Sequence, residues 1–266
     1  MDEPVITLTT DFGEASPYVA SMKGVILGIN AAARLLDLSH AIPPQNVRHT
    51  AFFLASAIPC FPTSAIHVVV IDPGVGTARD VLYVEVGGHR LVAPDNGCWT
   101  KLARECGGSP LVRRLENSQY WRQPISDTFH GRDILAPVAA HLSLGADPAQ
   151  LGAIVSRWVK LPEAKPERRK DGVTGEIDFV DDFGNLITNI PAMMLGPIAS
   201  GACRIEVGSR EILRLVRTYG EAAPGELLGL VSSGGMLEIA VNQGSAARML
   251  QVGAGTAVRV SFKEPR

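Results

Sequence analysis

Acidic residues follow three strand-like segments in the first half of the chain. They are Asp11, Asp72 and Asp95, and the segments before them are Val5–Thr9, Ile66–Ile71 and Arg90–Ala93. Ligands of an open α/β sheet bind beyond the carboxyl ends of its strands, so each acid is a candidate site residue. An acid in such a place also commonly caps the next helix or turn. We favour capping for Asp95, whereas both interpretations stay open for Asp11 and Asp72.

One of the six histidines, His130, stands apart from the others. It lies beside Gly131 at a predicted loop-to-helix junction, where a side chain can face a cleft. The other five lie within or beside ordinary elements. Asp11, Asp72, Asp95 and His130 have the ligand types of a hard-metal site. The sequence has neither a helical His-x-x-x-His pair nor a dense carboxylate cluster, so we expect a site without metal.

Strand-like and helix-like patterns alternate up to about residue 160. Apolar spacing predicts helices over Tyr18–Asn30, Val47–Ile58, Cys98–Glu105 and Ile134–Leu142. Leu35–Leu38 reads as a further strand, and Leu82–Val86 and Arg90–Ala93 can form a hairpin across Gly87-Gly88. The continuous apolar run Ile66–Ile71 is typical of a strand buried on both faces. We therefore predict an α/β domain, residues 1–160, with a mainly parallel sheet flanked by helices.

A change of pattern follows this first domain. Prolines and charges fill residues 161–171, which we interpret as a linker. Short β-like segments then alternate with Gly and Ser, and they are Thr174–Val180, Leu186–Asn189, Arg204–Val207, Leu227–Val231, Leu237–Val241 and Ala257–Phe262. Residues 172–266 are therefore predicted to form a smaller antiparallel, β-barrel-like domain.

The composition is that of an ordinary globular protein. The 266 residues are 46% hydrophobic and 20% charged, with a net charge of −2. Phosphate contacts need clustered Lys and Arg, so nucleic acid is not an expected partner. No apolar run is long enough to span a bilayer, the first residues lack a signal-peptide pattern, and the four cysteines form no Cys-x-x-Cys pair. We expect a cytoplasmic protein that does not bind membranes.

Six segments, taken together and in this order, carry a family resemblance. They are Thr9–Gly13, Val70–Thr77 with Arg79, Ala93–Gly97, Thr128–Asp133, Asp182–Asn189 and Ser232–Asn242. In these segments the chain resembles the SAM hydroxide adenosyltransferases, which hydrolyse S-adenosylmethionine (SAM) to adenosine and methionine. Relatives of that family include the SAM-dependent fluorinase and chlorinase. The resemblance covers nearly the whole chain.

The resemblance implies a role for each matching position. Asp72, Arg79 and His130 match the trio that positions the attacking water or hydroxide. Asp11 matches the carboxylate that grips the ribose hydroxyls, a role suited to its two acceptor oxygens. The full set of implied substrate-binding residues is Asp11, Phe12, Val75, Phe129, Gly131, Asp181, Asn185, Ser233, Glu238, Val241 and Gln243.

The parts of SAM are divided among these residues. Asn185 with Asp181 matches the pair that holds the methionine amino group, and Ser233 matches a contact to the methionine carboxylate. The stretch 241–244 matches the backbone that meets adenine. The resemblance also implies a homotrimer whose sites are shared between subunits. SAM is then the substrate, and no cofactor is expected.

Two alternative functions stay open. The halogenases carry Tyr at the position of Asp72 and a residue other than His at the position of His130. A carboxylate repels an incoming halide but accepts a hydrogen bond from water, so we favour water as the nucleophile. The second alternative is a SAM or adenosine sensor without catalysis, which would need no Asp-Arg-His trio.

The expected chemistry is simple, because the sulfonium of SAM leaves as a neutral thioether and needs no general acid. The site must hold a water in line, exclude solvent and bind a reactive conformation. Apolar Phe12, Val75 and Phe129 can form a hydrophobic surface that excludes water from the reacting atoms. Arg79 should keep Asp72 charged and therefore a poor base, so both are expected to orient the nucleophile. His130 is the group suited to tune or relay the proton near neutral pH.

Overall fold

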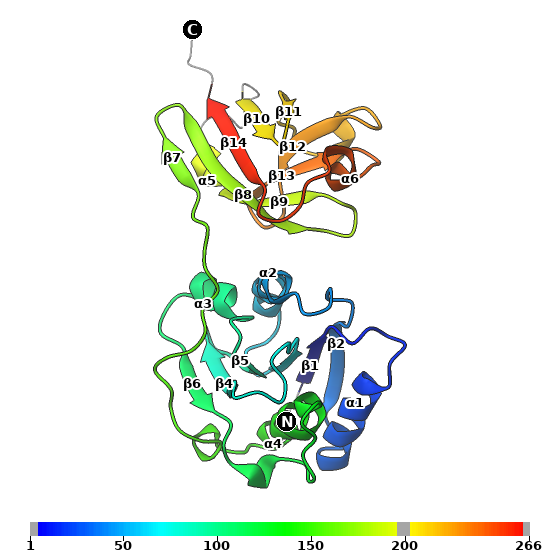
Figure 1. Cartoon of the computed structure of the whole chain (residues 1–266), viewed down its shortest axis with the longest axis vertical. Helices are drawn as coiled ribbons and strands as arrows, with labels where there is room; N and C mark the ends of the chain where they lie inside the picture. Colours follow the sequence, from blue (N-terminus) through cyan, green and yellow to red (C-terminus); the bar gives the residue numbers. More distant parts are fainter. Residues whose placement is uncertain (1–4, 196–202, 263–266) are drawn as a thin grey trace. The chain divides into compact units, whose positions relative to one another are not determined.

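The computed structural model describes residues 5–195 and 203–262. The chain divides between Leu161 and Pro162 into two compact units, and each is described by itself. The first unit is α/β and the second is almost entirely β (Figure 1). The predicted fold class is confirmed.

The first unit contains one six-stranded sheet. Its strands are β1 (Val5–Thr10), β2 (Arg34–Ser39), β3 (Ile66–Val70), β4 (Val81–Val86), β5 (His89–Pro94) and β6 (Leu111–Arg114). Their order across the sheet is β2-β1-β3-β5-β4-β6. The first four in this order are parallel, whereas β4 runs antiparallel to both β5 and β6. The sheet is therefore mixed. Strand β6, which the sequence did not predict, has only four residues and includes two arginines.

Helices cover both faces of this sheet. They are α1 (Tyr18–Ile29), α2 (Val47–Ala57), α3 (Thr100–Cys106) and α4 (Ala136–Ser143). Helices α1 and α4 pack together on one face, and α2 and α3 on the other. Every residue of β3 is buried, because Val68 and Val70 contact the first core and Val69 contacts the second. This is the physical reason for the unbroken apolar run.

A π-helical turn, Gly131–Leu135, precedes α4. The helix predicted over Ile134–Leu142 therefore begins two residues later than expected as an α-helix, at Ala136. π-Helical turns commonly mark functional positions, and this one follows His130 directly.

The second unit is an antiparallel sheet that closes nearly into a barrel. Its strands are β7 (Glu167–Arg169), β8 (Gly172–Val180), β9 (Leu186–Pro191), β10 (Cys203–Val207), β11 (Arg210–Ile212), β12 (Leu227–Val231), β13 (Met236–Val241) and β14 (Ala257–Phe262). The order is β11-β10-β14-β8-β9-β13-β12, and β7 pairs with β8. Strand β7 lies within the segment predicted as a linker. Short helices α5 (Ala192–Leu195) and α6 (Ala246–Leu250) complete the unit.

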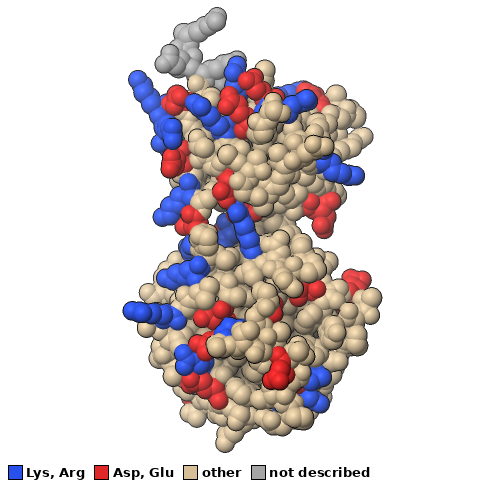
Figure 2. Space-filling view, viewed as in Figure 1, with Lys and Arg blue, Asp and Glu red and all other residues tan. Residues whose placement is uncertain are grey.

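The surface carries charges of both signs. On the face shown in Figure 2, basic and acidic side chains alternate over both units without a large area of one sign. None of the helices in the described ranges has the length and apolar character that crossing a bilayer requires.

Candidate active site

Asp72 and Arg79 form the centre of the candidate site in the first unit. Asp72 follows the end of β3, and two successive turns, closed by hydrogen bonds from Val75 N to Asp72 O and from Thr77 N to Gly74 O, bring the chain back. Arg79 then donates from Nε to Asp72 Oδ1 at 2.8 Å and from Nη2 to Asp72 Oδ2. The side chains of Asp72 and Arg79 are only 6% and 10% exposed, so solvent screens the pair weakly.

His130 joins this ion pair from a different part of the chain. Its Nδ1 lies 2.9 Å from Arg79 Nη2. A guanidinium can only donate, so Nδ1 is the acceptor and the proton of the neutral ring sits on Nε2. The pKa of His130 is lowered, first by burial and then by the positive charge of Arg79. The predicted trio is thus one hydrogen-bonded cluster with a neutral imidazole.

Asp11 emerges from the same edge of the sheet as Asp72, because Thr10 of β1 pairs in parallel with Val70 of β3. Its Oδ2 accepts a hydrogen bond from the backbone N–H of Gln45 at 2.8 Å. Gln45 has a φ of 62°, a left-handed conformation that is uncommon without glycine. The contact fixes the Asp11 carboxylate in place. Both of its oxygens have a second lone pair for a ligand.

Three aromatic rings pack together, and one of them belongs to Phe12, the residue after Asp11. The centroids of Phe12 and Phe129 are 5.7 Å apart, and Tyr18 lies 5.3 Å from each of them. Phe12 and Phe129 were predicted from sequence to line the site, but Tyr18 was not. The rings give the end of β1 an apolar wall that connects it to the segment carrying His130.

Gly131 and Val75 occupy positions of different kinds. A Cβ at Gly131 would lie 2.9 Å from Val70 Cγ1, so the backbone after His130 packs closely on the end of β3. Val75 is partly buried in the turn after β3. We favoured capping for Asp95, but the N-cap of α3 is Trp99 and has no side-chain cap; Asp95 instead accepts from Val159 N at 2.8 Å and holds a loop.

In the second unit, Asp181 and Asn185 form a tight pair. Asp181 Oδ1 accepts from the backbone N–H of Asn185 at 2.8 Å, and Oδ2 accepts from Asn185 Nδ2 at 2.9 Å. Gly184 between them approaches the start of α6 so closely that a Cβ would lie 2.0 Å from Ser245 Oγ. The turn is thereby held against α6, and the amide of Asn185 has a fixed orientation.

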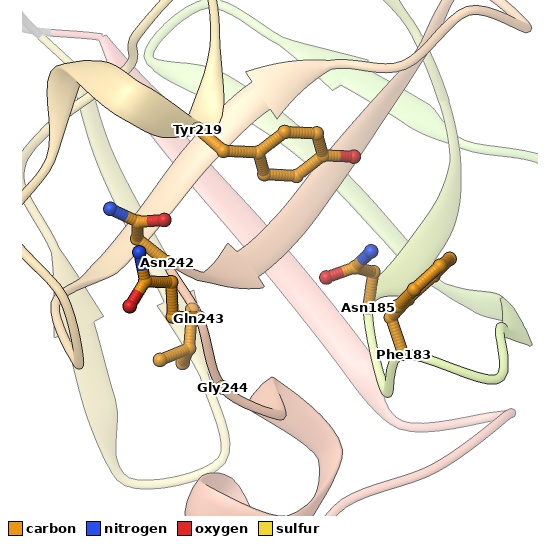
Figure 3. Close-up of a pocket in the computed structure, with 7 residues that line it drawn as sticks. Phe183, Asn185, Tyr219, Asn242, Gln243 and Gly244 are labelled. Atoms are coloured by element: carbon orange, nitrogen blue, oxygen red, sulfur yellow. The ribbon is translucent and has the colours of Figure 1, made fainter.

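A cavity of about 360 Å³ lies beside this turn. Its lining residues are Phe183, Asn185, Tyr219, Val241, Asn242, Gln243 and Gly244. Figure 3 shows Tyr219 on one side, Asn185 with Phe183 on another, and Asn242 with Gln243 on a third. Aromatic faces and amide edges together suit a planar, hydrogen-bonding ligand. The structure thus brings together Asn185 and the predicted stretch 241–244.

Tyr219 is a member of this cavity that sequence reasoning missed. Its hydroxyl donates to Glu238 Oε1 at 2.6 Å, and Glu238 is only 4% exposed. Burial raises the pKa of Glu238 and also that of Tyr219. The nearby Asp181 charge acts in the same direction on both groups. Tyr219 follows a loop without a motif, so its only sequence signal is an aromatic residue among polar ones.

Ser233 is exposed in the turn between β12 and β13, outside the residues that line the cavity. Among residues 5–195 and 203–262, no three His, Cys, Asp or Glu side chains gather in a way that could hold a metal ion.

Comparison with known proteins identifies the family. The model of the SAM hydroxide adenosyltransferase N-terminal domain matches residues 6–152, and that of the C-terminal domain matches residues 175–259. The chain belongs to the SAM hydroxide adenosyltransferase family. The two matches fall in the first and the second unit, respectively.

Several members of the family resemble the chain over nearly its full length. An (R)-S-adenosyl-L-methionine hydrolase of Salinispora tropica is 42% identical over 97% of this chain and 98% of its own. A protein of the same name from Thermus thermophilus is 38% identical over 97% and 99%. A fluorinase of Actinoplanes sp. is 25% identical over 97% of each chain. Identity is therefore higher to the hydrolases than to this halogenase.

Among solved structures, an uncharacterised conserved protein of Thermotoga maritima superposes with a TM-score of 0.90. It is 38% identical and matches 97% of this chain and 99% of its own. The chain thus shares its fold with this solved structure.

Proposed function

We propose that this protein hydrolyses S-adenosyl-L-methionine to adenosine and L-methionine by attack of water at C5′. The observation that carries the proposal is the Asp72–Arg79–His130 cluster in a chain that resembles named SAM hydrolases over 97% of its length. The water oxygen bonds to C5′, the C5′–S bond breaks with its electron pair staying on sulfur, and one proton leaves to solvent. Positive charge spreads from sulfur over C5′ and the attacking oxygen in this step, so a dry pocket favours the transition state over the more localised charge of the reactant.

Each member of the cluster has a defined task in this proposal. Asp72 accepts a hydrogen bond from the water and so orients it. Arg79 stabilises the developing hydroxide by its charge and holds both neighbours in place. In the tautomer that the contact with Arg79 requires, His130 has its Nδ1 lone pair directed to Arg79 and its proton on Nε2. We therefore assign His130 as a hydrogen-bond donor to the nucleophile rather than as the base.

The remaining residues bind the parts of SAM. Asp11 binds the ribose hydroxyls, and Phe12, Val75, Phe129 and Gly131 form the apolar surroundings of C5′. In the second unit, the cavity beside 241–244 accepts adenine, and Asp181 with Asn185 binds the methionine ammonium group. Ser233 contributes a contact to the methionine carboxylate. Glu238 contributes to the cavity indirectly, because it accepts the hydrogen bond that holds the Tyr219 side chain in place.

The test is incubation of the purified protein with SAM in oxygen-18 water, followed by mass analysis of the products. Label in the 5′-hydroxyl of adenosine supports attack by water at C5′. A parallel reaction with excess chloride or fluoride tests the halogenase alternative, because it would give a 5′-halogenated adenosine. If the protein binds SAM but the SAM stays intact for hours, the protein is instead a sensor.

Assembly, metal and location complete the proposal. We infer a homotrimer with sites shared between subunits, supported by the family resemblance, and light scattering after size-exclusion chromatography tests it. A fully active monomer would refute shared sites. We also infer that activity persists in EDTA, and that the protein is cytoplasmic, which cell fractionation tests. Scattered free thiols at Cys60, Cys98 and Cys106 fit a reducing compartment.

A further inference from the structure

Asp133 is a completely buried carboxylate three residues after His130. It lies in the π-helical turn Gly131–Leu135, and its side chain is 0% exposed. Buried charges persist only when they are paired and hydrogen-bonded, so its partners explain why it is tolerated. They are donors from two arginines and one backbone amide.

Two of these donors lie within the loop 122–130 itself. Arg122 Nη1 donates to Asp133 Oδ1 at 3.1 Å, and the backbone N–H of Ser126 donates to Oδ2 at 2.9 Å. The backbone N–H of Arg122 also donates to the carbonyl oxygen of Asp133 at 2.9 Å. One buried residue therefore ties down the start and the middle of the loop that leads to His130.

The third donor connects Asp133 to the aromatic wall. Arg132 donates to Asp133 from Nε at 2.7 Å and from Nη2 at 2.8 Å. Its guanidinium lies 5.0 Å from the ring centroid of Phe129, the residue just before His130. The two hydrogen bonds to Asp133 fix the orientation of the Arg132 guanidinium, which in turn packs over the ring of Phe129.

The loop also packs on the segment that carries Asp72 and Arg79. A Cβ on Gly76 would lie 2.4 Å from the carbonyl oxygen of Asp127, so the two backbones touch. Gly131 packs on the side chain of Val70, where a Cβ would lie 2.9 Å from Cγ1. A shift of residues 126–131 would therefore move His130 away from Arg79 Nη2, with which it forms a 2.9 Å hydrogen bond.

We propose that Asp133 is a positioning residue for the reaction, which sets the place of His130 and Phe129 by anchoring the loop 122–130 through Arg122, Arg132 and Ser126. This inference rests on the proposed SAM hydrolysis. Asp133 itself does not touch substrate. Its effect on rate passes through His130, and this separates it from a residue that merely stabilises the fold.

The experiment compares Asp133→Asn with wild type and with a matched control, Glu116→Gln. The introduced side-chain amide would place a donor against donors of Arg132 or Ser126, which breaks the anchor with little change of volume. Glu116 likewise accepts from an arginine and a backbone amide, but these partners, Arg114 and Ala153, lie outside the loop. Steady-state kinetics of adenosine release and hydrogen exchange of residues 122–130 are measured on all three proteins.

We expect Asp133→Asn to lower kcat about 100-fold, the loss typical of a misplacement near 1 Å, while KM changes much less. Hydrogen exchange of the loop should rise, and Glu116→Gln should leave both measures near wild type. In a His130→Ala background, adding Asp133→Asn should lower kcat by less than about a further 3-fold, because its effect passes through His130. An unchanged kcat, or the same loss in both backgrounds, overturns the proposal.

Two further outcomes are decided by the same measurements. If wild type releases no adenosine, the proposed function fails, and hydrogen exchange alone judges the anchor: unchanged exchange in Asp133→Asn overturns it, and faster exchange supports it. If Asp133→Asn does not fold, the exposed partner Arg122 is changed instead. Arg122→Gln should lower kcat about 10-fold, in proportion to one charged hydrogen bond at the weak end of its range, and raise loop exchange. No change in either overturns the proposal.

Discussion

Arg79 donates a hydrogen bond from Nη2 to Nδ1 of His130 at 2.9 Å. The same guanidinium holds both oxygens of Asp72, so one side chain fixes the two groups that are to contact the nucleophile. The contact also fixes the tautomer of His130, because a guanidinium has no acceptor. The nucleophile site is therefore arranged in advance, and its geometry depends on His130 staying neutral.

The first prediction concerns the pH dependence of catalysis. The pKa of His130 is lowered from its ordinary 6.5 by burial and by Arg79, against opposing effects of Asp72, Asp127 and Asp133. Protonation at Nδ1 would place an N–H against Arg79, so activity should fall as pH drops through the lowered pKa. We expect the acid limb of kcat/KM to have its midpoint below 6.5. Rates of adenosine release at pH 4.5 to 8, roughly the range in which His titrates, measure it.

The control for this limb is His130→Asn. The amide oxygen of Asn can still accept from Arg79 but does not titrate. The variant should be slower, and its remaining activity should lack the limb assigned to His130. An acid limb with the same midpoint in both proteins would assign the titration to another group.

The second prediction is that Arg79→Lys is not a conservative change. The guanidinium donates to the two carboxylate oxygens of Asp72 and also to Nδ1 of His130. The ammonium group of Lys lacks the planar set of donors that this requires. We expect kcat to fall about 100-fold, within the range for loss of a preorganised donor. Arg104→Lys, at a residue that donates to the Leu161 carbonyl, is the matched control and should keep full activity. Equal activity of the two variants would contradict the assigned role of Arg79.

Local sequence determined much of the fold but less of the site. The run Ile66–Ile71 identified a strand buried on both faces, because two cores take alternate side chains of β3. Strand β6 was not predicted because its four residues, two of them arginines, are too few to show a hydrophobic period. Only its pairing with β4 in the folded sheet defines it as a strand.

The candidate site divides in the same way. Asp72 and His130 were predicted from their places at the ends of elements, and the family resemblance connected them to Arg79. The tautomer of His130 could not be predicted, since it depends on which atom of a distant residue reaches Nδ1. Tyr219 was missed because it lies in a short 3-10 turn, Tyr219–Glu221, that carries no motif, and because its partner Glu238 on β13 is 19 residues away in the sequence.

The third prediction tests the cavity of the second unit. Tyr219→Phe removes the donor to buried Glu238, leaving that carboxylate less well satisfied. We expect KM for SAM to rise about 10-fold with little change in kcat, as for one lost hydrogen bond to a binding wall. Tyr120→Phe in the first unit is the control. A fall in kcat at constant KM would instead place Tyr219 in the chemical step.

The last prediction concerns stability in acid and involves a histidine outside the site. His67 is 1% exposed in β3, its Nδ1 lies 2.8 Å from Thr7 Oγ1, and burial lowers its pKa from 6.5 to about 4. Between these values the unfolded chain binds a proton at His67 and the folded chain does not, so lower pH favours unfolding. The difference corresponds to roughly 3 kcal/mol of unfolding free energy, lost between about pH 7 and pH 4.

His67→Asn removes this proton-linked loss. The unfolding free energy of the variant should therefore fall less steeply than that of wild type as the pH is lowered. Urea denaturation at pH 7 and pH 4.5, spanning about this window, measures the slope, with His49→Asn on α2 as a control expected to behave like wild type. Parallel slopes in all three proteins would show that another group carries the acid sensitivity.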